Sequence, residues 1–274
     1  MINDSKIFDC FTFFNEQKLL NIRFNVLNKF VDYFVICESK YDHRGEKKKL
    51  NFNVNDYSKF KDKIIYIVLD NFPNFKSPWD RQDFQRDYLL NGISKAKPDD
   101  ILLFSDVDEI PNLENNIDLI FKNPDKVGIF NQNVFYYKLN LKVVDYDQWE
   151  GTRVIKKKNL KTFSWLKNKI RLKNLRYRFW RIDKYKKIYK ISNGGWHFSF
   201  LGDPEMISSK IKSYTHSEYD KNDFTSIDQI RKRISELKDP YDRDKKLIRV
   251  KIDKSYPDHI INNQEYYKKL ISEL

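Results

Sequence analysis

Two aspartates separated by one residue are the clearest candidates for chemistry in this sequence. Asp106 and Asp108 directly follow the apolar run 101–104, whose composition predicts a short buried strand. Side chains alternate along an extended chain, so both carboxylates point to the same side, and Mg²⁺ or Mn²⁺ prefers such oxygen ligands. The same spacing occurs at Asp145–Asp147 and Asp242–Asp244, and a solvated acidic turn is the alternative interpretation. The preceding strand favours a metal site at the first pair.

A second cluster joins a glycine pair to a tryptophan and a histidine at residues 194–197. Glycine pairs allow the backbone to approach other chains closely. The flat face of Trp196 suits a sugar ring, and His197 is a candidate metal ligand. His216 and Glu218 form a similar pair farther along the chain. An ordinary turn or a surface helix end is the alternative interpretation for each.

Three polar side chains stand near the start of a predicted helix before the aspartate strand. Arg81 and Gln85 share a helix face by their spacing, and Arg86 follows directly. Guanidinium groups at a helix N-terminus can bind a pyrophosphate. A solvated face that pairs with Asp83 and Asp87 is an equally good interpretation.

Composition excludes several classes of protein. The chain has 274 residues, of which 40% are hydrophobic and 16% aromatic, which indicates a folded protein. Its seven glycines fit neither the dinucleotide fingerprint nor the Walker loop, and two cysteines are too few for a disulfide scaffold or a multi-cysteine zinc module. No apolar run approaches the ~18 residues that span a bilayer. With no secretory leader recognised, we expect a soluble, cytoplasmic protein.

The net charge of +13 is concentrated in one segment. Residues 153–190 hold sixteen Lys and Arg and one acidic residue, Asp183, which gives 16 − 1 = +15 and leaves 13 − 15 = −2 for the rest. Aromatic residues are interleaved with these charges: Phe163, Trp165, Tyr177, Phe179, Trp180, Tyr185 and Tyr189. Binding to nucleic acid or to an anionic membrane surface is therefore an alternative function, beside a lysine-rich solvated surface.

The elements that position these residues follow an α/β pattern. Unalternating apolar runs at 7–14, 33–37, 63–69 and 101–104 are separated by segments of helical periodicity, which predicts an open, mostly parallel sheet covered on both faces. We expect helices to begin at Asn15, Asp80, Asp203–Pro204 and Thr225 or Ser226, and a long strand at 127–141. We interpret 1–274 as a single domain with a nucleotide half at 1–125, an acceptor half at 126–219 and a helical tail at 220–274.

Five blocks of sequence, in order, resemble glycosyltransferase family 17. They are Asp9–Glu16, Val31–Ser39, Gln85–Arg86, Ser105–Pro111 and Gly194–Ser199, and the similarity continues to Lys210–Ile211 and His216-x-Glu218. The resemblance implies a GT-A-like fold and inverting transfer of a sugar, with N-acetylglucosamine expected, from a UDP-sugar to a glycan or glycoconjugate. Nucleic acid is then not an expected partner, whereas an anionic membrane surface stays open.

The resemblance also implies roles for individual residues. Asp108 would bind Mn²⁺ or Mg²⁺ and Asp106 the metal or the ribose, with His197 and then His216 as further metal ligands. The catalytic base would be Glu218 or, failing that, Glu205. The remaining expected contacts are Arg86 and then Arg81 with phosphate, Gln85 with the nucleotide-sugar, Glu16 and Glu38 with the nucleoside, and Trp149 and Trp196 with the acceptor.

Overall fold

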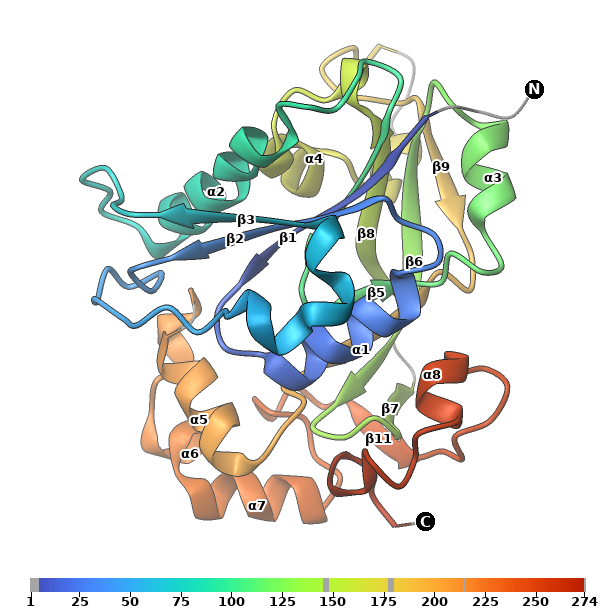
Figure 1. The fold of residues 1–274 in the computed structure, drawn as a ribbon. Helices are drawn as coiled ribbons and strands as arrows, with labels where there is room; N and C mark the ends of the chain where they lie inside the picture. The colour runs from blue at the N-terminus through green and yellow to red at the C-terminus, as the bar shows by residue number, and fades with distance from the viewer. Residues whose placement is uncertain (1–4, 145–147, 177–179, 214, 274) are drawn as a thin grey trace.

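A mixed sheet of eleven strands forms the centre of the computed structural model, which describes residues 5–144, 148–176, 180–213 and 215–273. Figure 1 shows this sheet with helices on both sides. The second pair of aspartates, Asp145 and Asp147, and the aromatic residues Tyr177 and Phe179 lie outside the described residues.

The described strands are β1 (Ile7–Phe13), β2 (Tyr33–Ser39), β3 (Ile64–Leu69), β4 (Ile101–Asp106), β5 (Glu109–Pro111), β6 (Val127–Tyr136), β7 (Leu141–Val144), β8 (Trp149–Lys156), β9 (Ile188–Ile191), β10 (Gly195–Ser199) and β11 (Lys246–Arg249). The α-helices are α1 (Gln17–Leu27), α2 (Pro78–Tyr88), α3 (Ile117–Lys122), α4 (Phe163–Lys169), α5 (Pro204–Ser213), α6 (Asn222–Thr225), α7 (Ile227–Ser235) and α8 (Asp258–Ile261). Short 3₁₀ helices are η1 (Val54–Lys63), η2 (Leu89–Ile93), η3 (Lys157–Asn159), η4 (Leu172–Arg176), η5 (Ser217–Tyr219) and η6 (Lys268–Leu270).

The sheet has a parallel half and a mixed half. Its strand order is β11-β7-β6-β8-β4-β1-β2-β3, with β9 and β10 also paired to β6 and β5 paired to β10. The strands β4, β1, β2 and β3 are mutually parallel, whereas β8 runs antiparallel between β4 and β6. The predicted α/β fold class and its parallel strands are therefore confirmed.

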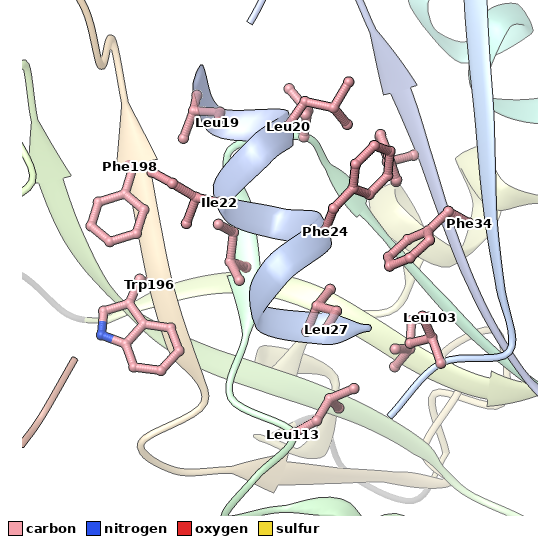
Figure 2. Close-up of a cluster of buried hydrophobic side chains, with 14 of the residues drawn as sticks. Leu19, Leu20, Ile22, Phe24, Leu27, Phe34, Leu103, Leu113, Trp196 and Phe198 are labelled. Carbon is pink, nitrogen blue, oxygen red and sulfur yellow. The ribbon is translucent and has the colours of Figure 1, made fainter. Parts of the chain in front are cut away.

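Helices bury both faces of the parallel half of the sheet. This explains why its strands are continuous apolar runs and do not alternate apolar with polar residues. On one face, Figure 2 shows α1 inserting its apolar stripe among residues such as Phe34, Leu103 and Trp196. On the other face, α4 and η2 cover Cys10, Phe104 and their neighbours. The helix α2 begins earlier than predicted, because the Ser77 side chain accepts a hydrogen bond from the Trp79 amide and Pro78 occupies the first turn.

The C-terminal part packs against the mixed half of the sheet. Helices α5 and α7 start where the sequence predicts, and their isoleucines pack with β6, β7 and β11 in a third core. The tail 220–274 contains helices and also the strand β11, which the sequence analysis did not predict and which pairs antiparallel with β7. This pairing brings the residues just before β11 close to the sheet.

The described part of the basic segment 153–190 is divided among β8, η3, α4, η4 and β9. Two of its cations, Arg153 and Lys167, are buried, and Lys156 and Lys158 pair with Asp99. These contacts distribute the charge over several elements. Among the described residues, no helix has the length and apolar character needed to cross a bilayer.

Candidate active site

A cleft with a cavity volume of about 230 Å³ opens at the carboxyl ends of β1, β2 and β4. One wall consists of the segments that follow these strands, together with two glutamines of α2. The opposite wall consists of β6, β10, α5 and the residues just before β11. Both aspartates of the Asp106–Asp108 motif line the cleft, at the edge where open α/β sheets bind their ligands.

A buried arginine of α1 fixes the backbone of the Asp106–Asp108 loop. Arg23 pairs with Asp9 of β1 through two nitrogen atoms, and both side chains are inaccessible to solvent. Its Nη1 donates to the carbonyl oxygens of Asp106, Val107 and Glu109 at 3.3, 3.3 and 2.9 Å. One guanidinium group therefore fixes the backbone of the loop that carries the two aspartates. The sequence analysis missed Arg23, although Asp9 belongs to the first resembling block.

Asp108 meets a lysine and a histidine from two other elements. Lys210 Nζ of α5 lies 3.0 Å from Asp108 Oδ2 and 3.4 Å from Glu16 Oε1. His197 Nε2 of β10 lies 3.6 Å from Asp108 Oδ1. Burial alone would raise the pKa of Asp108, but Lys210 and then His197 hold that pKa well below its usual range. The carboxylate is therefore ionised at neutral pH.

The glycine pair makes the approach of His197 to Asp108 possible. Strand β10 pairs antiparallel with β5, which places His197 opposite Glu109. Gly195 has φ +122°, and a Cβ there would lie 2.2 Å from the Ile110 carbonyl oxygen. At Gly194, a Cβ would lie 2.6 Å from the Asn131 amide nitrogen. The predicted close approach at this pair is confirmed.

Asp106 faces a different set of cations. Arg86 Nη2 lies 3.1 Å from Asp106 Oδ1, and Lys167 Nζ lies 3.4 Å from Oδ2. Lys167 also lies 2.5 Å from Oε2 of Glu109, which is fully buried and accepts a hydrogen bond from Trp149 Nε1. Burial alone would raise the pKa of Asp106, but Lys167 and then Arg86 keep that pKa well below its usual range. The two aspartates therefore occupy separate electrostatic environments.

Asp108 and His197 lie close enough together to share one divalent cation. Two ligands at about 2.1 Å from one ion lie at most about 4.2 Å apart, and their 3.6 Å separation falls within that span. Both aspartates are paired with cations in this structure, Asp108 with Lys210 and Asp106 with Arg86 and Lys167. Within the described parts of the chain, no group of three or more His, Cys, Asp and Glu could hold a metal. The geometry suits an ion completed by ligand oxygens.

The wall beyond β1 and β2 offers polar groups for a flat ring. Gln85 Oε1 lies 2.9 Å from His43 Nε2, and Gln85 Nε2 donates to the Cys37 carbonyl. Burial lowers the pKa of His43, so its ring is neutral at neutral pH. Gln82 is 5% exposed, and its Oε1 has no hydrogen-bond partner among the described residues. Glu16 also lines this wall, where its carboxylate accepts from two backbone amides.

Six of the predicted residues do not line the cleft: Arg86 and Glu218 contact the lining residues Asp106 and His216, and four others lie apart from it. Glu38 is fully buried and binds Lys48 and two backbone amides, and Arg81 donates to the carbonyls of His43 and Phe75. Trp196 lies in the apolar core (Figure 2), where its indole N–H donates to the Ser255 carbonyl. Glu205 pairs with an exposed arginine of α7. Each of these four side chains has a structural partner outside the cleft.

A histidine–carboxylate pair stands at the rim. His216 lines the cleft, and its Nδ1 lies 2.7 Å from Glu218 Oε1. This hydrogen bond lowers the pKa of Glu218. The ring of His216 also packs edge-on against Trp79, with ring centroids 4.7 Å apart. The structure therefore brings His216 to the cleft, with Glu218 behind it as its partner.

The opposite wall is aromatic and basic, which the sequence analysis did not foresee apart from Trp149. The Trp149 ring packs on His197, with centroids 4.9 Å apart. Tyr136, Phe200, Tyr219 and Tyr241 continue the wall, and Arg243 and Lys245 reach it from the segment before β11. The tail was predicted to be helical, so no sequence signal placed its cations at the site.

The chain was compared with known protein families. The model of glycosyltransferase family 17 matches residues 2–243. The chain belongs to glycosyltransferase family 17. Its expected membership is thus confirmed, and the blocks that suggested it include both aspartates, the glycine pair, His197 and Lys210.

Curated relatives in this family match part of the chain. It is 35% identical over 107 residues to the β-1,4-mannosyl-glycoprotein 4-β-N-acetylglucosaminyltransferase of Homo sapiens, a match that covers 35% of this chain and 20% of that protein. The enzyme of the same name from Mus musculus is 34% identical over the same length and coverage. The chain spans about a fifth of the length of the curated relatives that it matches.

Solved structures show only remote similarity. HddC from Yersinia pseudotuberculosis has a TM-score of 0.39 at 11% identity, covering 68% of this chain and 90% of its own. A 4-diphosphocytidyl-2C-methyl-D-erythritol synthase has a TM-score of 0.36 at 12% identity, covering 57% and 77%. At these scores the similarities carry no argument about function.

Proposed function

We propose that this protein transfers a sugar, N-acetylglucosamine, from a UDP-sugar to a hydroxyl group of a glycan or glycoconjugate, with inversion at the anomeric carbon. Its family supports the reaction class. The observation that carries the proposal is the meeting of Asp108, His197 and Lys210 in a cleft at the carboxyl end of β4. Carboxylate, imidazole and ammonium groups at that edge suit a metal-bound diphosphate.

The nucleoside would lie against the wall beyond β1 and β2. Gln82 and Gln85 are buried amides there, and the Gln82 oxygen without a partner can accept a hydrogen bond from a base N–H. His43 is held neutral by burial, so it adds no charge near the base. The amide groups supply directional recognition, as expected for a site that reads a nucleobase.

The diphosphate would lie over Asp108. Mn²⁺ or Mg²⁺ bound by Asp108 and His197 would stabilise the negative charge that develops on the leaving UDP. Lys210 neutralises Asp108 in this structure, and its ammonium provides a second positive charge beside the phosphates. Arg86 and Lys167 pair with the neighbouring Asp106.

The acceptor would enter from the rim and rest against Trp149. His216 lies at this rim with Glu218 bonded to its Nδ1, and a histidine oriented by a carboxylate is a common device for accepting a proton from a hydroxyl group. We therefore assign proton removal to His216 and the orienting role to Glu218. His216→Gln should lower turnover and leave the affinity for UDP unchanged.

Calorimetric titration of UDP with and without Mn²⁺ tests the proposal. Wild-type protein should bind UDP in a Mn²⁺-dependent way, and saturation at 100 times the dissociation constant should raise stability by about 2.7 kcal/mol. Asp108→Asn should abolish the Mn²⁺ dependence, while Asp228→Asn, on an exposed turn of α7, should not. No binding of UDP would contradict the proposal. Stabilisation by short DNA or RNA with a steep salt dependence would support nucleic-acid binding by residues 153–190 instead.

A further inference from the structure

The two walls of the cleft differ in their charged side chains. The carboxylates that line it, Glu16, Asp42, Asp106 and Asp108, all lie at or after the carboxyl ends of β1, β2 or β4, on the same wall as Lys48. The segment before β11 contributes Arg243 and Lys245, and the lining residues of β6, β10 and that segment include no carboxylate within the described chain. The cleft therefore has a second basic region, separate from Lys210.

The two cations of this region meet at one hydroxyl group. Arg243 Nη2 lies 3.2 Å from the Tyr136 hydroxyl oxygen, and Lys245 Nζ lies 3.5 Å from it. Asp239 accepts from Nε and Nη2 of Arg243, both at 2.9 Å, and from the Tyr241 amide. Asp239 is almost fully buried, so it orients the guanidinium from behind. Arg243 Nη1 makes no hydrogen bond to any described residue.

Aromatic rings surround this region. Tyr219 and Tyr241 are stacked with centroids 3.8 Å apart, and the Arg243 guanidinium lies over the Tyr241 ring at 5.0 Å. Phe200 packs edge-on against Tyr241 and Tyr136. Flat apolar faces beside fixed cations suit a sugar ring that carries an acidic group.

The basic region is displaced from the predicted diphosphate position. His197 is paired with Val134, and Ser199 with Tyr136, two residues farther along both strands. Two residues of a strand span about 6.6 Å, so the Tyr136 position lies that far beyond the Asp108–His197 pair along the sheet. Burial and then the charge of Arg243 lower the pKa of Lys245, and an anion bound between the two side chains would relieve this repulsion.

We propose that the acceptor is an acidic saccharide, whose carboxylate or phosphate group is bound by Lys245 and Arg243 beside the aromatic wall. That the acidic sugar acts as the acceptor rests on the proposed function. That the cleft binds an acidic sugar rests only on the charged and aromatic residues of the opposite wall.

Three methyl glycosides that differ only at carbon 6 test the proposal: methyl glucoside, methyl glucuronide and methyl glucoside 6-phosphate. Dissociation constants are measured by calorimetry with wild-type protein, Lys245→Met, Lys245→Arg and the matched control Lys246→Met, a neighbouring exposed lysine. Wild-type protein, Lys245→Arg and the control should bind at least one charged sugar about tenfold more tightly than the neutral one. Lys245→Met should lose that preference. The glucuronide and the phosphate distinguish a carboxylate from a phosphate group.

The result that overturns the proposal is equal affinity for all three sugars, or no measurable binding of either charged sugar by wild-type protein. A Lys245→Met protein whose affinity for UDP with Mn²⁺ falls as much as its affinity for the sugar would also overturn it, because Lys245 would then serve the donor. UDP binding without charge preference refutes this inference alone. Charge preference without UDP binding refutes the proposed function and leaves the acidic-sugar site.

Discussion

Removing the ammonium group of Lys167 tests how the Asp106–Asp108 loop is supported. Lys167→Met keeps the apolar stem but leaves the fully buried Glu109 with two hydrogen-bond donors among the described residues, the Trp149 N–H and the Asp106 amide. Breaking a buried ion pair by removing one partner costs about 3–5 kcal/mol. At about 2–4 °C per kcal/mol for a chain of this size, the melting temperature should fall by roughly 6–20 °C.

A double-mutant cycle separates the charge from the packing. Glu109→Gln removes the buried negative charge, so Lys167→Met should cost at least about 2 kcal/mol less in that background than in the wild type. Lys169→Met changes an exposed lysine of the same helix and should alter stability by less than about 0.5 kcal/mol. Urea unfolding, followed by tryptophan fluorescence and by circular dichroism, provides the four free energies.

The same variant has a defined pH dependence. Lys167 and Arg86 depress the pKa of Asp106, so the stability that this carboxylate contributes is present above about pH 4 and is lost as the pH falls through the folded-state value. The difference between wild type and Lys167→Met should therefore be largest at neutral pH and shrink below about pH 4. A cost under about 1 kcal/mol at pH 7, or strictly additive effects in the cycle, would refute the buried-charge reasoning.

Three further predictions follow from buried groups. Arg23→Leu strands the Asp9 carboxylate and three loop carbonyls, so urea unfolding should show a loss of about 3–5 kcal/mol, and wild-type stability would contradict it. Gly195→Ala places a Cβ against the Ile110 carbonyl oxygen at a residue with positive φ. The free energy of unfolding should fall by about 3 kcal/mol in the same assay. A fall of less than about 1 kcal/mol would argue against the close approach. Burial raises the pKa of both cysteine thiols, so a colorimetric thiol reagent should label neither until urea is added, and rapid labelling of the native protein would contradict it.

The sequence predicted those parts of the fold that local patterns determine. Strands buried on both faces are continuous apolar runs, so β1, β2, β3 and β4 could be identified, as could the starts of α5 and α7 from Pro204 and Ser226. The strand β11 was missed because its four residues carry only a short apolar pattern and pair with a strand about a hundred residues earlier.

The sequence indicated in advance two residues that the structure brings together in the cleft, Asp108 and His197. Residues that act through distant contacts gave no such signal. Lys167 lies within a basic segment that suggested a surface, yet it points inward to Glu109. Trp196 suggested a sugar platform, but its place on β10 directs the ring into the core, since alternate residues of a strand face opposite sides. Contacts between residues far apart in the sequence determine where the Lys167 and Trp196 side chains point.

Turnover of a UDP-sugar by wild-type protein and by Asp108→Asn tests the central claim most directly. Release of UDP is measured for a panel of UDP-sugars with Mn²⁺ and with the neutral and acidic sugars as acceptors. We predict that the wild type releases UDP with one donor, UDP-N-acetylglucosamine, and that Asp108→Asn loses at least about 100-fold of this rate while it still unfolds in a cooperative urea transition. Undiminished turnover by a folded Asp108→Asn protein, or no release of UDP from any donor by the wild type, would contradict the claim.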